Sequence, residues 1–98
     1  MRIFNGKLSG ATSGGFFQGN ITNLNCLCHQ ILVSPVSNTT QYDVQILNQD
    51  NKIIYERTSE IGQLAELTEL PMLGTYTINI LNATVDESFS ICLVARED

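Results

Sequence analysis

The stretch QYDVQI, residues 41 to 46, alternates polar and apolar side chains, and this pattern decides the fold class. Its three apolar side chains fall on one side of an extended chain, which is typical of a strand with one face in water. Turn-forming residues follow at 48–51, and the apolar segment KIIYE comes next at 52–56. We therefore predict a β-hairpin, in which Asn51 takes the left-handed conformation that such turns usually assign to glycine.

Period-two patterns recur further along the chain. Residues 75–80 and 88–93 each alternate apolar and polar side chains. The segment 82–87 between them has the composition of a loop, so we predict a second hairpin here.

The segment NCLCHQILV, residues 25–33, is apolar on both faces of an extended chain. Strict alternation places its apolar side chains in two sets, which are Leu27, Ile31 and Val33 on one face and Cys26, Cys28 and Leu32 on the other. A strand with this pattern is typically covered on both sides. We therefore predict that the strand is buried on both faces.

Residues 59–71 fit a helical period and a strand period equally well. Gly62 lowers helix stability by about 1 kcal/mol relative to alanine, and Pro71 ends any helix that precedes it. We expect extended structure, with a short helical turn as the alternative.

Six or seven short strands at regular spacing predict an all-β fold, an antiparallel β-sandwich. The pattern does not choose between an Ig-like and a jelly-roll-like topology. The expected core contains Tyr76 and Phe89, together with Ile46, Ile78 and Leu93.

Residues 1–24 hold five of the seven glycines and few apolar side chains. This composition supplies little to bury, so we expect an N-terminal Gly-rich arm, or short strands, ahead of a sandwich domain at residues 25–98. The arm's larger apolar side chains still need burial. A neighbouring subunit would provide it, although packing against its own domain would also serve. We expect the partner-binding residues to be Phe4, Phe16, Phe17 and Ile21.

The charge balance excludes several classes of partner. Five Lys and Arg against ten Asp and Glu give a net charge of −5, and the cations are scattered along the chain. Because nucleic acids and anionic lipids are bound by clustered cations, we expect neither as a partner. No apolar run is long enough to span a bilayer, and the first residues lack the apolar core of a signal peptide, so we expect synthesis in a cytosol.

The sequence contains no recognisable catalytic set or cofactor motif. Cys26, Cys28 and His29 include zinc-ligand types but lie within an apolar strand pattern, so we expect buried cysteines and no metal. Asp43, Asn48 and Asp50 carry too few ligands for a calcium loop. A hydrolase is one further interpretation, and its activity would depend on His29, the single histidine. Asp86 and Glu87 are expected at a solvated loop tip, and no enzyme is predicted.

Residues 26–95 resemble a bacterial pre-peptidase C-terminal β-sandwich. The resemblance lies in the strand around Asp43, the turn NQDNK at 48–52, the strand GTYTINI at 74–80 and the closing strand SFSICL at 88–93. Asn51 stands where that pattern has a turn glycine. The resemblance implies a compact sandwich and names no catalytic residue in this chain.

The whole chain is also similar in organisation to small β-rich proteins of tailed-bacteriophage virions. This resemblance implies a virion structural protein, either a capsid decoration (cement) protein or a head–tail accessory protein. Its partners would be the major capsid protein or another virion protein, and further copies in a homo-oligomer. It would be made in the host cytoplasm and located in the virion. Strand edges at residues 52–57 or 88–95 could be continued by another chain.

The alternative is a carbohydrate- or surface-binding module of a tail or fibre. Sugar sites usually contain exposed aromatic side chains, and the sequence has no tryptophan. Tyr42, Tyr55 or a phenylalanine would have to serve. An aromatic side chain exposed in a concave patch would distinguish this function from assembly.

Overall fold

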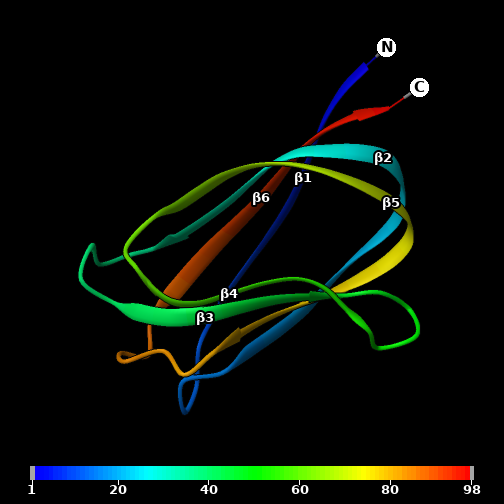
Figure 1. Cartoon of the computed structure of the whole chain (residues 1–98). Coiled ribbons are helices and arrows are strands. Elements are labelled where there is room, and N and C mark those ends of the chain that lie inside the picture. The colour runs from blue at the N-terminus through cyan, green and yellow to red at the C-terminus, as the bar shows by residue number, and fades with distance from the viewer. Residues whose placement is uncertain (1, 98) are drawn as a thin grey trace.

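The protein is an all-β domain of six antiparallel strands, as seen in a computed structural model that describes residues 2 to 97 (Figure 1). The strands join into one sheet with the order β1-β6-β2-β5-β3-β4. The all-β prediction is confirmed. The bounds are β1 (Arg2–Ala11), β2 (Phe17–Pro35), β3 (Gln41–Leu47), β4 (Ile53–Ile61), β5 (Leu64–Leu81) and β6 (Ser88–Glu97).

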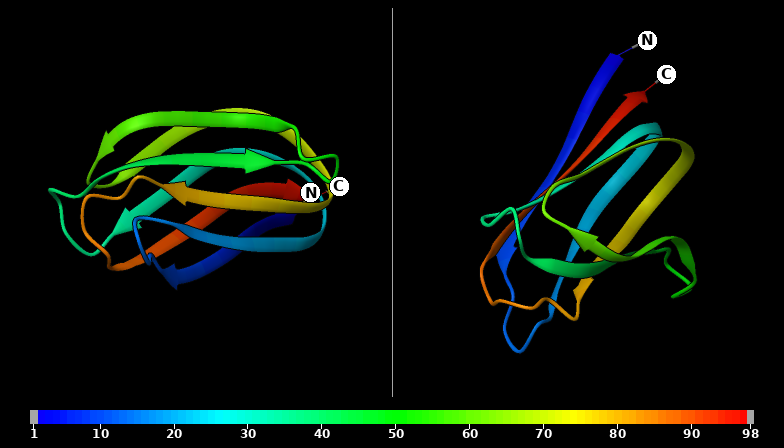
Figure 2. Two further views of the ribbon diagram at one scale, coloured as in Figure 1. Left: turned by 90° about the horizontal axis from the view of Figure 1, so that it is seen from below. Right: turned by 60° about the vertical axis from the view of Figure 1, so that its left-hand side comes forward.

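The two longest strands bend and fold the sheet over on itself (Figures 1 and 2). Pairing between β2 and β5 is interrupted after Ile21 and resumes at Leu24. Both strands have a positive φ at this point, 58° at Asn23 and 96° at Gly74. We call the two halves layer A, formed by β1, β6, the end of β2 and the start of β5, and layer B, formed by the start of β2, the end of β5, β3 and β4. The bend therefore produces a two-layered, sandwich-like arrangement from a single sheet.

The core lies between the two layers. The ring of Tyr42 in layer B meets that of Phe89 in layer A edge-to-face, with ring centroids 5.1 Å apart. Aromatic pairs in this geometry add about 0.5–1.5 kcal/mol beyond the area that they bury. The five residues predicted for the core, Ile46, Tyr76, Ile78, Phe89 and Leu93, are all buried.

The first predicted hairpin is confirmed. β3 pairs with β4, and Asn51 has a φ of 61° in the turn between them. The side-chain oxygen of Asn48 accepts the backbone N–H groups of Asp50 and Lys52, at 2.9 and 3.0 Å. Extended structure over residues 59–71 is also confirmed, with a short break between β4 and β5.

The second predicted hairpin is wrong. β5 pairs with β2 and β3, whereas β6 lies between β1 and β2. The loop at 82–87 therefore carries the chain from layer B to layer A. This topology also makes residues 88–95 an interior strand, so the prediction of an open edge there is wrong. Residues 52–57, by contrast, lie largely within β4, an outermost strand of the sheet.

A separate Gly-rich arm at residues 1–24 is not confirmed. β1 pairs with β6 over ten consecutive residues, and the rest of this region enters β2 after a short turn. Glycines allow β1 and β2 to approach closely, because a Cβ at Gly10 would lie 2.1 Å from the Phe17 ring and one at Gly19 2.8 Å from Leu8. Packing against the same domain, the alternative that the sequence left open, is what the structure shows for residues 2–24.

Candidate interaction surface

A β-bulge at His29 resets the faces of β2. Cys28 and Gln30 pair with consecutive residues of β6, so His29 is the extra residue. Because a bulge shifts the alternation by one, Cys28 shares the inner face with Ile31 instead of lying opposite it. The face assignment made from strict alternation is therefore wrong beyond residue 28.

The prediction that β2 is buried on both faces is wrong for its outer face. Cys28, Ile31 and Val33 are fully buried on the inner side, whereas Leu27 and Leu32 on the outer side are only half-buried. Nothing in the described chain covers the outer side. β2 is therefore apolar on both faces, but within residues 2–97 only its inner face is covered.

Neighbouring strands extend this outer side into a broad apolar surface. Leu27 pairs with Pro71 of β5, and Leu32 lies between Ala65 of β5 and Cys92 of β6. Directly opposite residues share one face of a sheet, so Ala65, Leu32 and Cys92 form one row across layer A, and Leu27 and Pro71 form another. Gln30 lies between Leu67 and Val94, and Arg96 lies opposite Leu27. We call the whole set the apolar face, defined as Ile3, Leu27, Leu32, Ala65, Leu67, Pro71, Leu73, Cys92 and Val94.

Several members of the apolar face are strongly exposed. Leu67 is 79% exposed, Leu73 73% and Ile3 64%. Single exposed apolar residues are normal on proteins, whereas several exposed apolar residues gathered on one sheet face indicate an interaction site. The apolar face is therefore the leading candidate for a binding surface.

Few charges interrupt the apolar face. By strand register it carries Lys7 on β1, Arg96 on β6 and Glu69 on β5. Of the acidic residues that the structure describes, Glu69 alone lies on this face, although the chain as a whole has a net charge of −5. A partner that covers the face would therefore desolvate few charged groups, which removes a main cost of docking.

The outer side of layer B has the opposite character. Amide and hydroxyl side chains cover it and bond to one another across strands. Gln18 donates to Asn79 at 3.0 Å, and Thr77 donates to Asn20 at 3.0 Å. A hydrogen-bonded polar face of this kind is stable in water, so the two outer surfaces differ in their need for a cover.

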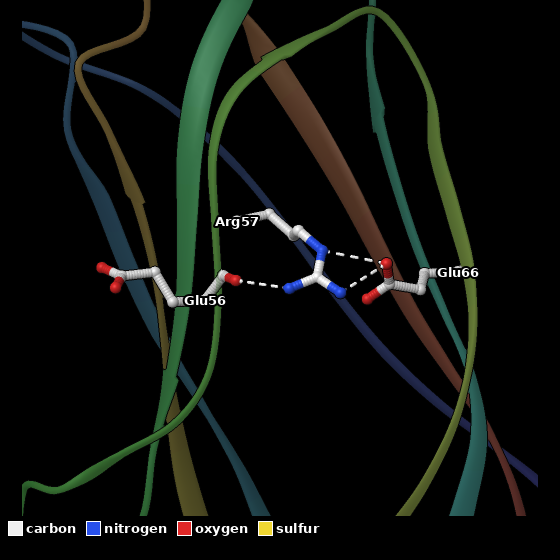
Figure 3. A network of polar contacts seen from close by, with 3 residues as sticks. All are labelled: Glu56, Arg57 and Glu66. Carbon is white, nitrogen blue, oxygen red and sulfur yellow. Dashed lines mark hydrogen bonds and ion pairs between the residues drawn. The ribbon is translucent and has the colours of Figure 1, made fainter.

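Arg57 closes the open corner between the two layers (Figure 3). Its guanidinium donates from Nε and Nη2 to one carboxylate oxygen of Glu66 on β5, at 2.9 and 2.7 Å, and from Nη1 to the Glu56 carbonyl at 2.9 Å. The pair links β4 to the start of β5, which are not hydrogen-bonded to each other. Arg57 is exposed and Glu66 is half-buried at the surface, so we assign the pair to positioning β4 and not to chemistry.

Two shallow hollows lie beside the apolar face. The larger, about 380 Å³, is lined by His29, Leu67, Thr68 and Glu69 at the bulge. The smaller, about 200 Å³, is lined by Asn25, Cys26, Leu27 and Arg96. Neither lining includes an aromatic side chain. The aromatic platform that a sugar site usually needs is thus missing from both hollows.

The four partner-binding residues predicted from the sequence do not lie together on the surface. Ile21 belongs to the core, and Phe4 and Phe17 pack against it. Phe16, in the turn before β2, is 44% exposed. Partner binding by these residues stays a prediction, because no partner chain is present to test it. The sequence feature that indicates the apolar face is instead the strand at residues 25–33, which is apolar on both of its faces.

The cysteines are free and do not form a reactive centre. Cys28 is buried, and this burial raises the pKa of its thiol to about 11, so it stays protonated at neutral pH. Thiols in this state are poor nucleophiles and poor metal ligands. Within residues 2–97, no three ligating side chains of the His, Cys, Asp and Glu types lie close enough to hold a metal ion.

The acidic residues considered for chemistry are engaged in structure. Asp43 accepts the backbone N–H of Ser59 at 2.8 Å and the amide of Asn82 at 2.9 Å. Asp86 accepts the N–H groups of Gly14 and Gly15, at 3.0 and 2.8 Å. These two carboxylates link separate segments of the chain. The prediction of a merely solvated loop tip at Asp86 missed this role.

Comparisons with known proteins leave the family open. No family model matches the chain, and no curated protein sequence matches it. One similar solved chain is from a structure of infectious bursal disease virus, Gx strain, with a TM-score of 0.43 and 10% identity, covering 98% of this chain and 32% of that chain. Another is from the Gt strain of the same virus, with a TM-score of 0.39 and 9% identity, covering 95% and 31%.

The chain thus spans about a third of the length of these two viral chains. At these TM-scores and identities, the likeness defines neither the fold nor the function of this protein. The comparisons confirm neither the pre-peptidase resemblance nor the tailed-bacteriophage resemblance. Across residues 2–97 there is no helix long and apolar enough to cross a membrane.

Proposed function

We propose that this protein is a non-catalytic structural protein of a virion, which binds a neighbouring protein subunit through its apolar face. The observation that carries the proposal is the exposure of Leu67 and Leu73 on a sheet face that nothing in the described chain covers. Burial of apolar area contributes about 25 cal/mol per Å², so covering such a face provides the driving force for docking.

Assembly suits this chain better than catalysis. Its carboxylates and histidine are spread over different loops and strands, and its buried thiol is protonated at neutral pH. A hydrolase needs a nucleophile, a base and a group that stabilises developing charge in one place. The described residues bring no such set together, whereas they do bring apolar side chains together on one face.

The virion setting and the decoration (cement) or head–tail accessory role rest on the resemblance of organisation described from the sequence. The partner would be the major capsid protein or another virion protein with an apolar surface of its own. Many copies on a repeating shell raise one another's effective concentration, so each contact can be weak. Phe16, which is exposed in the turn before β2, stays a proposed addition to such a contact.

The test is co-sedimentation of the purified protein with virus particles from cells that carry its gene. Leu67→Asp with Leu73→Asp should abolish co-sedimentation, because two carboxylates would have to be desolvated on docking. Thr22→Asp with Gln41→Asp adds the same charge at exposed positions outside the apolar face and should sediment like the wild type.

Two results would overturn the proposal. Particles purified on a density gradient would contain none of this protein, or the Leu67 and Leu73 variant would bind as tightly as the control variant. Far-ultraviolet circular dichroism of both variants shows that any loss of binding does not come from unfolding.

A further inference from the structure

β1 is a long and regular open edge. It is the outermost strand of layer A and pairs with β6 from Arg2 to Ala11 without a register shift. Its other side has no paired strand in the described chain, so a row of backbone N–H and C=O groups is free to bond. Edges of this kind are templates for pairing with another chain unless a bulge, a proline or a cover protects them.

The opposite edge of the sheet is protected by such devices. β4 has two register shifts against β3, and Ser59 within it has a positive φ of 57°. Arg57 also reaches from β4 to Glu66 (Figure 3). β1 has no register shift and no positive φ. Phe17 packs against Gly10 and Lys7 carries a charge, but no strand pairs with the outer side of β1 in the described chain, so it is the edge at which a further strand can be added.

We propose that two copies of this protein pair antiparallel along β1, about a two-fold axis at Gly6. In this register Phe4 of one copy lies opposite Leu8 of the other, and Asn5 lies opposite Lys7. The two residues of each pair lie on the same face, as a continuous sheet requires. This self-association goes beyond the proposed docking of the apolar face and does not depend on it.

Charge and length select Gly6 as the centre. An axis at Lys7 would place two ammonium groups directly opposite each other, which is destabilising. An axis at Asn5 would shorten the overlap to residues 2–8, whereas an axis at Gly6 pairs residues 2–10. The segment 2–11 contains no acidic residue, so this pairing places no two carboxylates opposite each other.

The inner side of β1 is prepared for this contact. Phe4 and Leu8 face the core but remain partly exposed, because β1 is the last strand of layer A. A second β1 would cover both side chains through two symmetry-related contacts. Aromatic and aliphatic side chains that lie directly opposite each other stabilise the pairing of two strands.

The geometry has a consequence for the apolar face. A two-fold axis perpendicular to the sheet leaves each copy's outer side on the same side of the joined sheet. The apolar faces of the two copies would therefore point the same way, apart from the twist of the sheet. A dimer of this kind presents two docking surfaces to one repeating partner, which raises its avidity.

Substitutions at Asn5 test the pairing, since this side chain is exposed and faces Lys7 of the second copy. Sedimentation equilibrium should show a wild-type dimer. Asn5→Lys places like charges opposite each other twice in each dimer and should raise the dissociation constant about tenfold, whereas Asn5→Glu should lower it by a similar factor. Ser90→Lys adds the same charge on the outer side of β6, an interior strand, and should leave the constant within about twofold.

Three results would overturn the proposal. The wild-type protein would stay monomeric at about 1 mM, a concentration at which even a weak dimer forms. A dimer would form whose dissociation constant responds to neither Asn5 variant. Alternatively, Leu67→Asp with Leu73→Asp would dissolve the dimer, which would mean that the copies meet through their apolar faces. Failure here leaves the particle-binding test unaffected, because that test measures a different surface.

Discussion

Thr40 donates its hydroxyl hydrogen bond to the carboxylate of Glu87, although the two lie 47 positions apart in the sequence. The same carboxylate accepts the backbone N–H of Ser37 at 3.1 Å. The backbone N–H of Glu87 donates to the Thr12 hydroxyl at 3.1 Å, and the N–H of Thr12 donates back to the Glu87 carbonyl at 3.0 Å. Glu87 thus joins three loops at one end of the molecule.

Glu87→Ala should therefore lower the free energy of unfolding by about 2 kcal/mol, because it leaves the Thr40 hydroxyl and the Ser37 amide without their acceptor. Urea denaturation followed by circular dichroism measures the change. Glu69→Ala, at an exposed carboxylate on β5, is the control and should change stability by less than about 0.5 kcal/mol. Equal losses in the two variants would contradict a structural role for Glu87.

Asp86 should make stability depend on acidic pH. The N–H groups of Gly15 and then Gly14 stabilise its charged form and lower the pKa of its carboxyl group. The pKa is higher in the unfolded chain, so the contribution is complete above that unfolded value and is lost as pH falls through the lowered folded value. The melting temperature should therefore fall below about pH 4.

Asp86→Asn isolates this effect, because the amide has no charge to lose. Melting curves recorded across the acidic range should show a lower melting temperature at neutral pH and a shallower acid decline than in the wild type. Parallel curves for the two proteins would show that the Asp86 carboxylate does not contribute to the acid dependence.

The sequence was sufficient for features governed by local pattern. The hairpin around Asn51 follows from alternation on both sides of a turn, and both signals lie within twenty residues. The extended segment at 59–71 followed from Gly62 and Pro71, which disfavour a helix. In each case, residues close in sequence determine the backbone.

The pairing of strands that lie far apart in the sequence could not be predicted in the same way. The pairing of β1 with β6 joins the two ends of the chain, and no local pattern of residues 2–11 specifies that partner. The glycine content predicts a loose arm, yet Gly10 is required by the close approach of the Phe17 ring. The bulge at His29 likewise changed which side of β2 each later residue occupies. The apolar face could be inferred only in part, from a strand that is apolar on both sides.

Two tyrosines provide a matched test of buried hydroxyl groups. The Tyr42 hydroxyl donates to the Gly62 carbonyl at 2.8 Å, whereas the Tyr55 hydroxyl is buried near the Glu66 carboxylate and makes no hydrogen bond of normal geometry among the described residues. Removing a satisfied hydroxyl leaves its acceptor unpaired, whereas removing an unsatisfied one relieves a desolvation cost. Tyr42→Phe should destabilise the fold by about 1 kcal/mol, and Tyr55→Phe should be neutral or stabilising by up to about 1 kcal/mol.

Thermal and urea unfolding of the two variants should give opposite or clearly unequal shifts. A loss of stability in Tyr55→Phe as large as that in Tyr42→Phe would mean that the Tyr55 hydroxyl has a partner in solution. Burial, followed by the nearby Glu66 carboxylate, raises the pKa of Tyr55, so the hydroxyl remains protonated throughout these measurements.

Gly10 should tolerate no side chain while Phe17 is present. An added Cβ would lie 2.1 Å from the Phe17 ring, so the ring or the strand would have to move. Overpacking of this kind costs about 1–3 kcal/mol. Gly10→Ala should lower the free energy of unfolding, measured in urea, by that amount. In the double variant Gly10→Ala with Phe17→Leu, the loss should be smaller than the sum of the two single losses, because the smaller side chain leaves room for the added Cβ. Ser9→Ala, at the exposed neighbouring position, is the control, and a fully additive double variant would refute the contact.

The apolar face should be dispensable for folding, which separates it from the core on the other side of the same sheet. Leu67 and Leu73 are mostly exposed, so Leu67→Ser with Leu73→Ser should change the free energy of unfolding by less than about 1 kcal/mol. Ile31→Ser on the inner side buries a hydroxyl in a fully apolar position and should cost at least about 3 kcal/mol. The wild type should also bind the dye ANS, because native exposed apolar surface adsorbs it, and the Leu67 and Leu73 variant should bind less. If that variant unfolded like Ile31→Ser, the face would belong to the core, and its exposure would not mark a binding surface.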